Sequence, residues 1–150
     1  MKEVLEEAGL IPDVLDQAPL YELKVAFGDQ NNAVVNFGNF LLPDDLNDEL
    51  SIYINTTAEH DSYYFLIMTD IDYPTPDSPD RREYIHWIAM NIRGVDLYSG
   101  DVLTAYAPPG TNVHGPGIHR YVFYYIKQRS SGPILDPDYF DYALPLNRYV

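Results

Sequence analysis

Apolar residues recur at every second position along much of the chain, and the spacing typical of an amphipathic helix is nearly absent. Apolar and polar side chains alternate over residues 21–27 and 50–55, which predicts two strands with one face exposed to water. Shorter strands are expected over Val34–Phe40 and Val102–Tyr106. The pattern therefore predicts a mostly β protein.

Three further runs are almost continuously apolar or aromatic: Tyr63–Met68, Tyr84–Met90 and Tyr121–Ile126. Runs of this kind are typical of central strands that are buried on both faces. Because several strands are expected to be buried in this way, we predict an antiparallel β-sandwich of two sheets with few short helices.

Helix is expected at only two places. One is the N-terminal segment Lys2–Ala8, and the other is a short turn over Asp44–Glu49, where Asp44 can serve as the N-cap after Pro43.

Prolines and glycines gather in residues 73–79 and 107–117, and both stretches are predicted to be loops. The sequence contains no internal repeat and no polar linker. We therefore expect one domain over residues 1–150.

The chain is strongly acidic, with 23 acidic against nine basic residues and a formal net charge of −14. Such a surface repels phosphate backbones and anionic membranes, so nucleic acid is not an expected partner. Residues 1–80 contain two basic and 17 acidic side chains, whereas residues 81–150 contain seven basic and six acidic ones. A bound anion is therefore expected to contact the second of these segments.

Several features of other protein classes are missing from the sequence. No stretch approaches the roughly 18 consecutive apolar residues of a transmembrane segment, and the acidic N-terminus is unlike a secretion signal. The chain has no cysteine, which excludes disulfides and thiolate chemistry. We expect a cytoplasmic protein.

Four polar side chains lie within or beside the apolar runs, where an unpaired polar group is costly. Asp70 and Asp72 follow the first run, His86 lies in the second, and His119 precedes the third. If these strands are neighbours, two carboxylates and two imidazoles converge at one end of a sheet.

Three chemistries fit such a cluster. Two histidines and a carboxylate can bind a divalent metal, although the short fixed spacing of common metal motifs is absent. Catalysis needs an activated nucleophile, and the sequence offers only Ser78 and Thr69 without a recognisable nucleophile motif. In anion recognition, imidazole and backbone N–H groups donate to phosphate-like oxygens while the carboxylates orient the histidines.

Two groups of motifs follow one another around these residues. The first comprises Met68–Pro74, Arg82–Trp87 and Asn91–Gly94, which resemble a D-P-D-x-P loop, an R-E-x-x-H strand and an N-I-P-G turn. The second comprises Tyr106–Pro109 and Gly115–Phe123, which match Y-x-P-P and G-x-G-x-H-R-Y-V-F. In this order the motifs resemble the two signature regions of the phosphatidylethanolamine-binding protein family.

The resemblance implies a β-sandwich with a small anion pocket at one end. Carried over position by position, the pocket residues are Asp70, Asp72, Pro74, His86, Gly117, His119 and Tyr121. The pocket lip corresponds to Arg82, Glu83 and Tyr84. The family also has cis peptides at the positions of Tyr73–Pro74 and Arg82–Glu83.

The resemblance implies a binding module rather than an enzyme, and we expect no cofactor and no metal. Its expected ligands are phospholipid head groups or phosphorylated small molecules, and its expected protein partner is a regulated protein such as a kinase or protease. Because histidines titrate near neutrality, anion affinity is expected to rise as the pH falls. The alternative is a structural or scaffold protein that kept the fold and acts through its acidic surface in a larger assembly.

Three positions depart from the family pattern. Ile71 and Arg93 each stand in place of a proline, and Arg81 replaces an aromatic residue. Arg81 either strengthens the attraction of phosphate or pairs with the acidic first part of the chain.

The C-terminal region, from about residue 129, is atypically short for the family, and its prolines exclude a long terminal helix. Tyr139, Phe140 and Tyr142 need a surface on which to pack. Either they fold over a sheet of their own domain, or they cover the pocket mouth, or a partner covers it.

Overall fold

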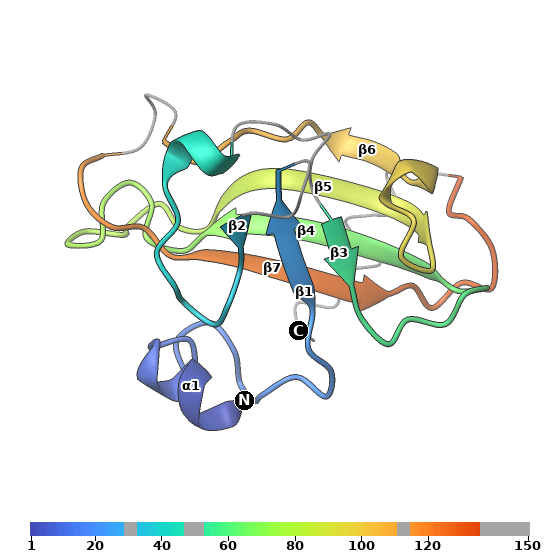
Figure 1. Cartoon of the computed structure of the whole chain (residues 1–150), viewed down its shortest axis with the longest axis horizontal. Coiled ribbons are helices and arrows are strands. Elements are labelled where there is room, and N and C mark those ends of the chain that lie inside the picture. Colours follow the sequence, from blue (N-terminus) through green and yellow to red (C-terminus); the bar gives the residue numbers. More distant parts are fainter. Residues whose placement is uncertain (29–32, 47–52, 111–114, 136–150) are drawn as a thin grey trace.

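The computed structural model describes residues 1–28, 33–46, 53–110 and 115–135. Within these ranges the strands form two antiparallel sheets that pack face to face (Figure 1). This two-layer arrangement confirms the predicted mostly β sandwich. The tail residues Tyr139, Phe140 and Tyr142 lie outside the described ranges.

The smaller sheet has the strand order β2-β1-β3 and the larger one β6-β5-β4-β7. The strands are β1 (Lys24–Phe27), β2 (Ala33–Val34), β3 (Tyr53–Asn55), β4 (Tyr63–Asp70), β5 (Tyr84–Arg93), β6 (Asp101–Thr104) and β7 (Tyr121–Lys127). The helical elements are α1 (Lys2–Glu7) and the 3-10 helices η1 (Pro43–Leu46) and η3 (Leu97–Ser99). None of the helices within the described ranges is long and apolar enough to cross a bilayer.

The continuous apolar run of β4 is explained by cover on both faces of the larger sheet. On one face Leu66 and Met68 pack with Phe27 of the smaller sheet. On the other face the core contains Ile71, just after β4, together with Leu15 of the N-terminal segment. Because both faces are removed from water, an alternating pattern is not needed in this strand.

The third apolar run is not a central strand among the described residues. β7 pairs with β4 and stands at the end of the strand order. Its burial alternates, with Val122 and Tyr124 buried and their neighbours only partly so. The prediction was wrong for this run. Its aromatic side chains form a continuous apolar run in the sequence, although several of them are partly exposed at the end of the sheet.

The strand predicted over Val34–Phe40 ends at Val34. Beyond it the side chain of Asn39 accepts a hydrogen bond from the Asn36 amide (2.6 Å) and donates to the Val34 carbonyl (2.9 Å). Phe37 has a positive φ of 43°, which is incompatible with an extended strand. Local side-chain hydrogen bonds therefore replace the predicted ladder.

Other predicted boundaries shift by a few residues. β1 begins at Lys24, later than predicted, and β6 ends at Thr104, earlier than predicted. The 3-10 helix η1 begins at Pro43, so Asp44 lies within it rather than at its N-cap. η3 was not predicted. It forms in a tight turn after β5, where the Tyr98 amide donates a hydrogen bond to the side chain of Asp96, the N-cap residue.

Candidate functional site

The end of β4 lies between two aromatic residues of its neighbouring strands. β4 continues to Asp70, beyond the apolar run that predicted it. In the strand register Asp70 is opposite Tyr84 in β5 and opposite Tyr121 in β7. The topology thus brings the ends of three strands together around one buried carboxylate.

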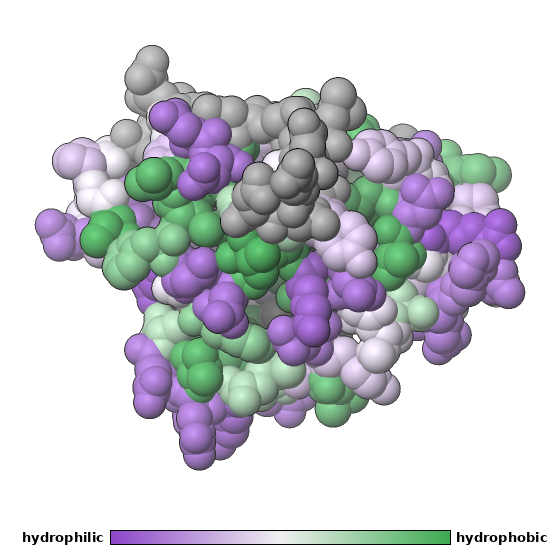
Figure 2. Space-filling model, viewed as in Figure 1, coloured by the Kyte–Doolittle hydropathy of each residue, from purple (hydrophilic) through white to green (hydrophobic). Residues whose placement is uncertain are grey.

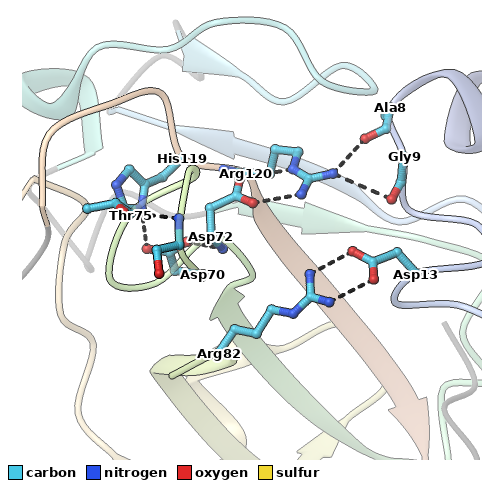
Figure 3. Close-up of polar contacts among 10 residues, drawn as sticks. Ala8, Gly9, Asp13, Asp70, Asp72, Thr75, Arg82, His119 and Arg120 are labelled. Carbon is cyan, nitrogen blue, oxygen red and sulfur yellow. Dashed lines mark hydrogen bonds and ion pairs between the residues drawn. The ribbon is translucent and has the colours of Figure 1, made fainter. Parts of the chain in front are cut away.

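Asp70 forms a buried pair with His119. The His119 Nδ1 lies 2.6 Å from Asp70 Oδ2, and both side chains are almost fully enclosed (Figure 3). The second ring nitrogen, Nε2, lies 3.2 Å from the carbonyl oxygen of Gly115. Since both partners are acceptors, only the doubly protonated ring satisfies both contacts at once.

His86 supplies a second imidazole from near the start of β5. It is fully buried, and its Nδ1 lies 2.5 Å from the carbonyl oxygen of Ala107. Its ring meets those of Tyr84 and Tyr121 edge-on, with centroids 5.1 Å apart in each pair. The loop after β6 and the two tyrosines thereby fix the ring in place.

Tyr121 lies next to both histidine rings, with its centroid 6.4 Å from that of His119. Burial raises the pKa of the Tyr121 hydroxyl well above its ordinary value, and the negative charge of Asp70 raises it further. The hydroxyl is therefore protonated at neutral pH and can donate a hydrogen bond.

Two loops rich in proline and glycine pack against each other beside His119. The Gly115 amide donates to the Pro74 carbonyl at 2.8 Å. Gly117 has a φ of +131°, and a Cβ atom there would lie 2.8 Å from Pro76 Cδ. The Tyr73–Pro74 peptide is cis, and so is the Arg82–Glu83 peptide, as the resemblance implied.

Asp72 is buried like Asp70, but its partner is Arg120 instead of a histidine. It accepts hydrogen bonds from the Arg120 backbone amide (2.8 Å), Nε (2.9 Å) and Nη2 (2.6 Å). Burial raises the pKa of Asp72, but the hydrogen bonds from Arg120 outweigh it, so that the pKa lies below its ordinary value. Arg120 Nη1 also donates to the Ala8 carbonyl at 3.0 Å (Figure 3).

The three predicted lip residues point to different partners. The Arg82 guanidinium forms two hydrogen bonds to Asp13, at 2.6 and 2.7 Å. Glu83 accepts from Thr69 Oγ1 at 3.1 Å and from the Tyr124 hydroxyl at 3.3 Å. Tyr84 is the lip residue whose ring contacts His86.

Sequence reasoning missed the roles of Arg120 and Ala107. Arg120 directly follows His119 within the second motif, and its charge beside an apolar run was an available signal. Ala107 acts through its carbonyl oxygen, which no side-chain pattern can indicate. Within the part of the chain that the structure describes, no three histidine or acidic side chains are grouped as a metal site.

Comparison with known proteins shows the family of this chain. The family model described as phosphatidylethanolamine-binding protein matches residues 25–147. A 26 kDa secreted antigen of Toxocara canis is 31% identical over 131 residues, which cover 86% of this chain but only 48% of the antigen. The chain thus spans about half the length of that relative.

A plant relative and a solved structure agree with the family match. The protein named MOTHER of FT and TFL1 homolog 2 from Oryza sativa subsp. japonica is 31% identical over 133 residues, covering 85% of this chain and 72% of that protein. The structure of the phosphatidylethanolamine-binding protein from Plasmodium vivax shares the fold, with a TM-score of 0.64 at 23% identity, covering 91% of this chain and 79% of that one. The chain belongs to the phosphatidylethanolamine-binding protein family.

Proposed function

We propose that the chain is a binding module that takes a phosphate-bearing ligand, such as a phospholipid head group or a phosphorylated small molecule. The ligand binds among His86, His119 and Tyr121, and the module regulates a partner protein such as a kinase or protease. Family membership supports a binding and regulatory role in general. We propose no catalytic role.

One observation carries the proposal: two imidazoles converge on the partly buried Tyr121, and a buried carboxylate holds one of them. A phosphate oxygen can replace the Gly115 carbonyl as the acceptor of the His119 Nε2 hydrogen. Protonation of His86 adds a further N–H donor and a positive charge. The charge of Asp70 offsets part of the attraction, so the affinity for a small anion is modest.

The test is an NMR titration of the histidine ring signals with phosphorylethanolamine and, separately, with inorganic phosphate. We expect saturable shifts at His86 and His119, because imidazole N–H groups donate hydrogen bonds to phosphate oxygens. His86→Ala should abolish the shift at His119. His60→Ala is the matched control, because the side chain of His60 is 91% exposed and pairs with Asp61 on the surface.

Silent histidine signals in the millimolar range would exclude the anion site. The scaffold alternative would then be favoured, and capture of basic protein partners through the acidic surface would become its test.

The cytoplasmic location is also a proposal. Imaging of the tagged chain tests it, and the secreted antigen of Toxocara canis shows why that measurement is needed.

A further inference from the structure

A large, mainly apolar cavity lies beside the edge strand β7. Its volume is about 1160 Å³, and its walls come from α1, from residues 17–25 and 35–43, and from β7. Among its lining side chains are core residues from both faces of the larger sheet, including Met68 and Leu15. Its volume lies slightly above the usual range for small-molecule sites and is far larger than a phosphate group requires.

Exposed apolar residues gather at this cavity. They are Leu20, Tyr21, Phe37, Phe40, Leu42 and Ile118, and each of them lines it. Leu20 and Phe40 are 89% and 79% exposed, which is unusual for side chains of this size. Figure 2 shows a hollow on this face, between α1 and the strands, with apolar residues in green beside it. An exposed apolar patch around a hollow indicates a binding surface.

The cavity is continuous with the candidate anion site. Gly117, His119 and Tyr121 are predicted site residues, and all three also line the cavity. Its two cationic lining side chains are already paired, Arg120 with Asp72 and Lys127 with Glu59. The described cavity is therefore apolar over most of its wall and has its anion-binding groups at the His119 end.

We propose that this cavity binds the hydrocarbon chain of an amphiphilic anion whose phosphate group contacts His119. The inference rests on the proposed function and extends it from a head group to a whole single-chain amphiphile. The occupant is one molecule and not a membrane surface, because the net charge of −14 repels an anionic leaflet. A concave, mainly apolar wall also suits a flexible chain better than a flat partner surface.

The test uses ethyl phosphate, decyl phosphate below its micelle concentration, and decanol, each titrated against the full chain labelled at its methionine methyl groups. Met68 lines the cavity, whereas Met90 is buried elsewhere and does not. Ethyl phosphate should shift the His86 and His119 ring signals and leave Met68 unchanged, whereas decyl phosphate should shift the Met68 signal as well. Decyl phosphate should bind at least about 100-fold more tightly, which burial of a few additional methylene groups provides.

A pair of matched variants separates the cavity from general surface effects. Phe40→Glu places a charge at the cavity mouth and should weaken decyl phosphate binding at least about tenfold without changing the affinity for ethyl phosphate. Tyr98→Glu is the control, because Tyr98 is similarly exposed (71%) and lies outside the cavity lining. Both positions are at the surface, so neither change is expected to prevent folding.

The outcomes distinguish this inference from the proposed function. If ethyl and decyl phosphate bind equally and Met68 stays silent, the cavity inference is overturned while the anion site stands. A second outcome is that ethyl phosphate does not shift the His119 signal and that decyl phosphate and decanol bind equally. Both the anion site and the placement of the phosphate group at His119 are then overturned. Loss of decyl phosphate binding in Tyr98→Glu as well as in Phe40→Glu also contradicts the inference.

Discussion

The side chain of Arg120 forms hydrogen bonds with two segments that are far apart in the sequence, the N-terminal segment and the loop after β4. It neutralises the buried Asp72 and donates hydrogen bonds to the carbonyls of Ala8 and Gly9 (3.0 and 3.4 Å). The N-terminal segment is thereby fixed to the loop that carries Asp72, next to the candidate site. Arg82 and Asp13 form a second, more exposed link between the same regions.

Replacing Asp72 with Asn tests the buried pair. We expect Asp72→Asn to lower the free energy of unfolding by about 1–3 kcal/mol near neutral pH, because Arg120 keeps its charge and loses a charged acceptor. Asp13→Asn is the control at the more exposed pair and should cost no more than about 1 kcal/mol. Urea denaturation measures both, and equal losses would contradict the assigned difference between the pairs.

The same pair gives a pH dependence with a definite sign. The pKa of Asp72 is lowered in the folded chain from its ordinary value of 3.8. The stabilisation is therefore complete above pH 3.8 and is lost as the pH falls through the folded-state pKa. We expect the stability difference between wild type and Asp72→Asn to shrink in that acidic range, and a constant difference would contradict this.

At the scale of elements, the two loops beside His119 support each other. Gly115 approaches the other loop so closely that a Cβ atom would lie 2.3 Å from Thr75 Cγ2 and 2.7 Å from the Pro74 oxygen. Its carbonyl oxygen is also the acceptor facing His119 Nε2. The absence of a side chain at this position therefore sets both the loop packing and the surroundings of the histidine.

Gly115→Ala should separate these loops. We expect a loss of about 1–3 kcal/mol in the free energy of unfolding, from the clash with backbone and side-chain atoms. The phosphate-induced shift of the His119 ring signal should also weaken. Gly132→Ala is the control, because a Cβ atom there meets nothing within 4 Å. If the two variants are equally stable and bind phosphate equally, the loop contact has no such role.

At the scale of the whole molecule, charge is distributed unevenly and mostly with one sign. The net charge is −14, and folding brings these negative charges closer together than they are in the unfolded chain. Their mutual repulsion therefore destabilises the folded state. Local pairs such as Lys127 with Glu59 and Arg93 with Asp61 relieve it at single points (2.7 and 2.6 Å). Arg93, which stands where the family has proline, thus has a partner on the surface.

Salt should therefore stabilise the chain. We expect the free energy of unfolding to rise by a few tenths to about 1 kcal/mol between about 10 mM and about 300 mM NaCl, because screening weakens the overall repulsion. Urea denaturation with sodium chloride measures this, and phosphate buffer is left out so that the candidate anion site is not occupied. A fall in stability with salt would mean that attractive pairs outweigh the repulsion.

The local pattern of apolar and polar residues in the sequence was enough to predict the mostly β class and the histidines of the candidate site. The runs that form β4 and β5 were predictable because apolar residues must leave water, whatever their partners are. His86 and His119 were identified because a polar group inside such a run needs a partner. These inferences require only neighbours along the chain, and the structure places both histidines next to Tyr121.

Only the tertiary structure decided which partner each polar group has. Asp70 and Asp72 look equivalent in the sequence, yet one binds His119 and the other Arg120. Asn91 belongs to a family turn motif, but within β5 it has a φ of +58° and accepts a hydrogen bond from Gln128 at 3.1 Å. Such pairings depend on which distant segments the packed sheets bring within hydrogen-bond distance, and periodicity along the chain does not contain that information.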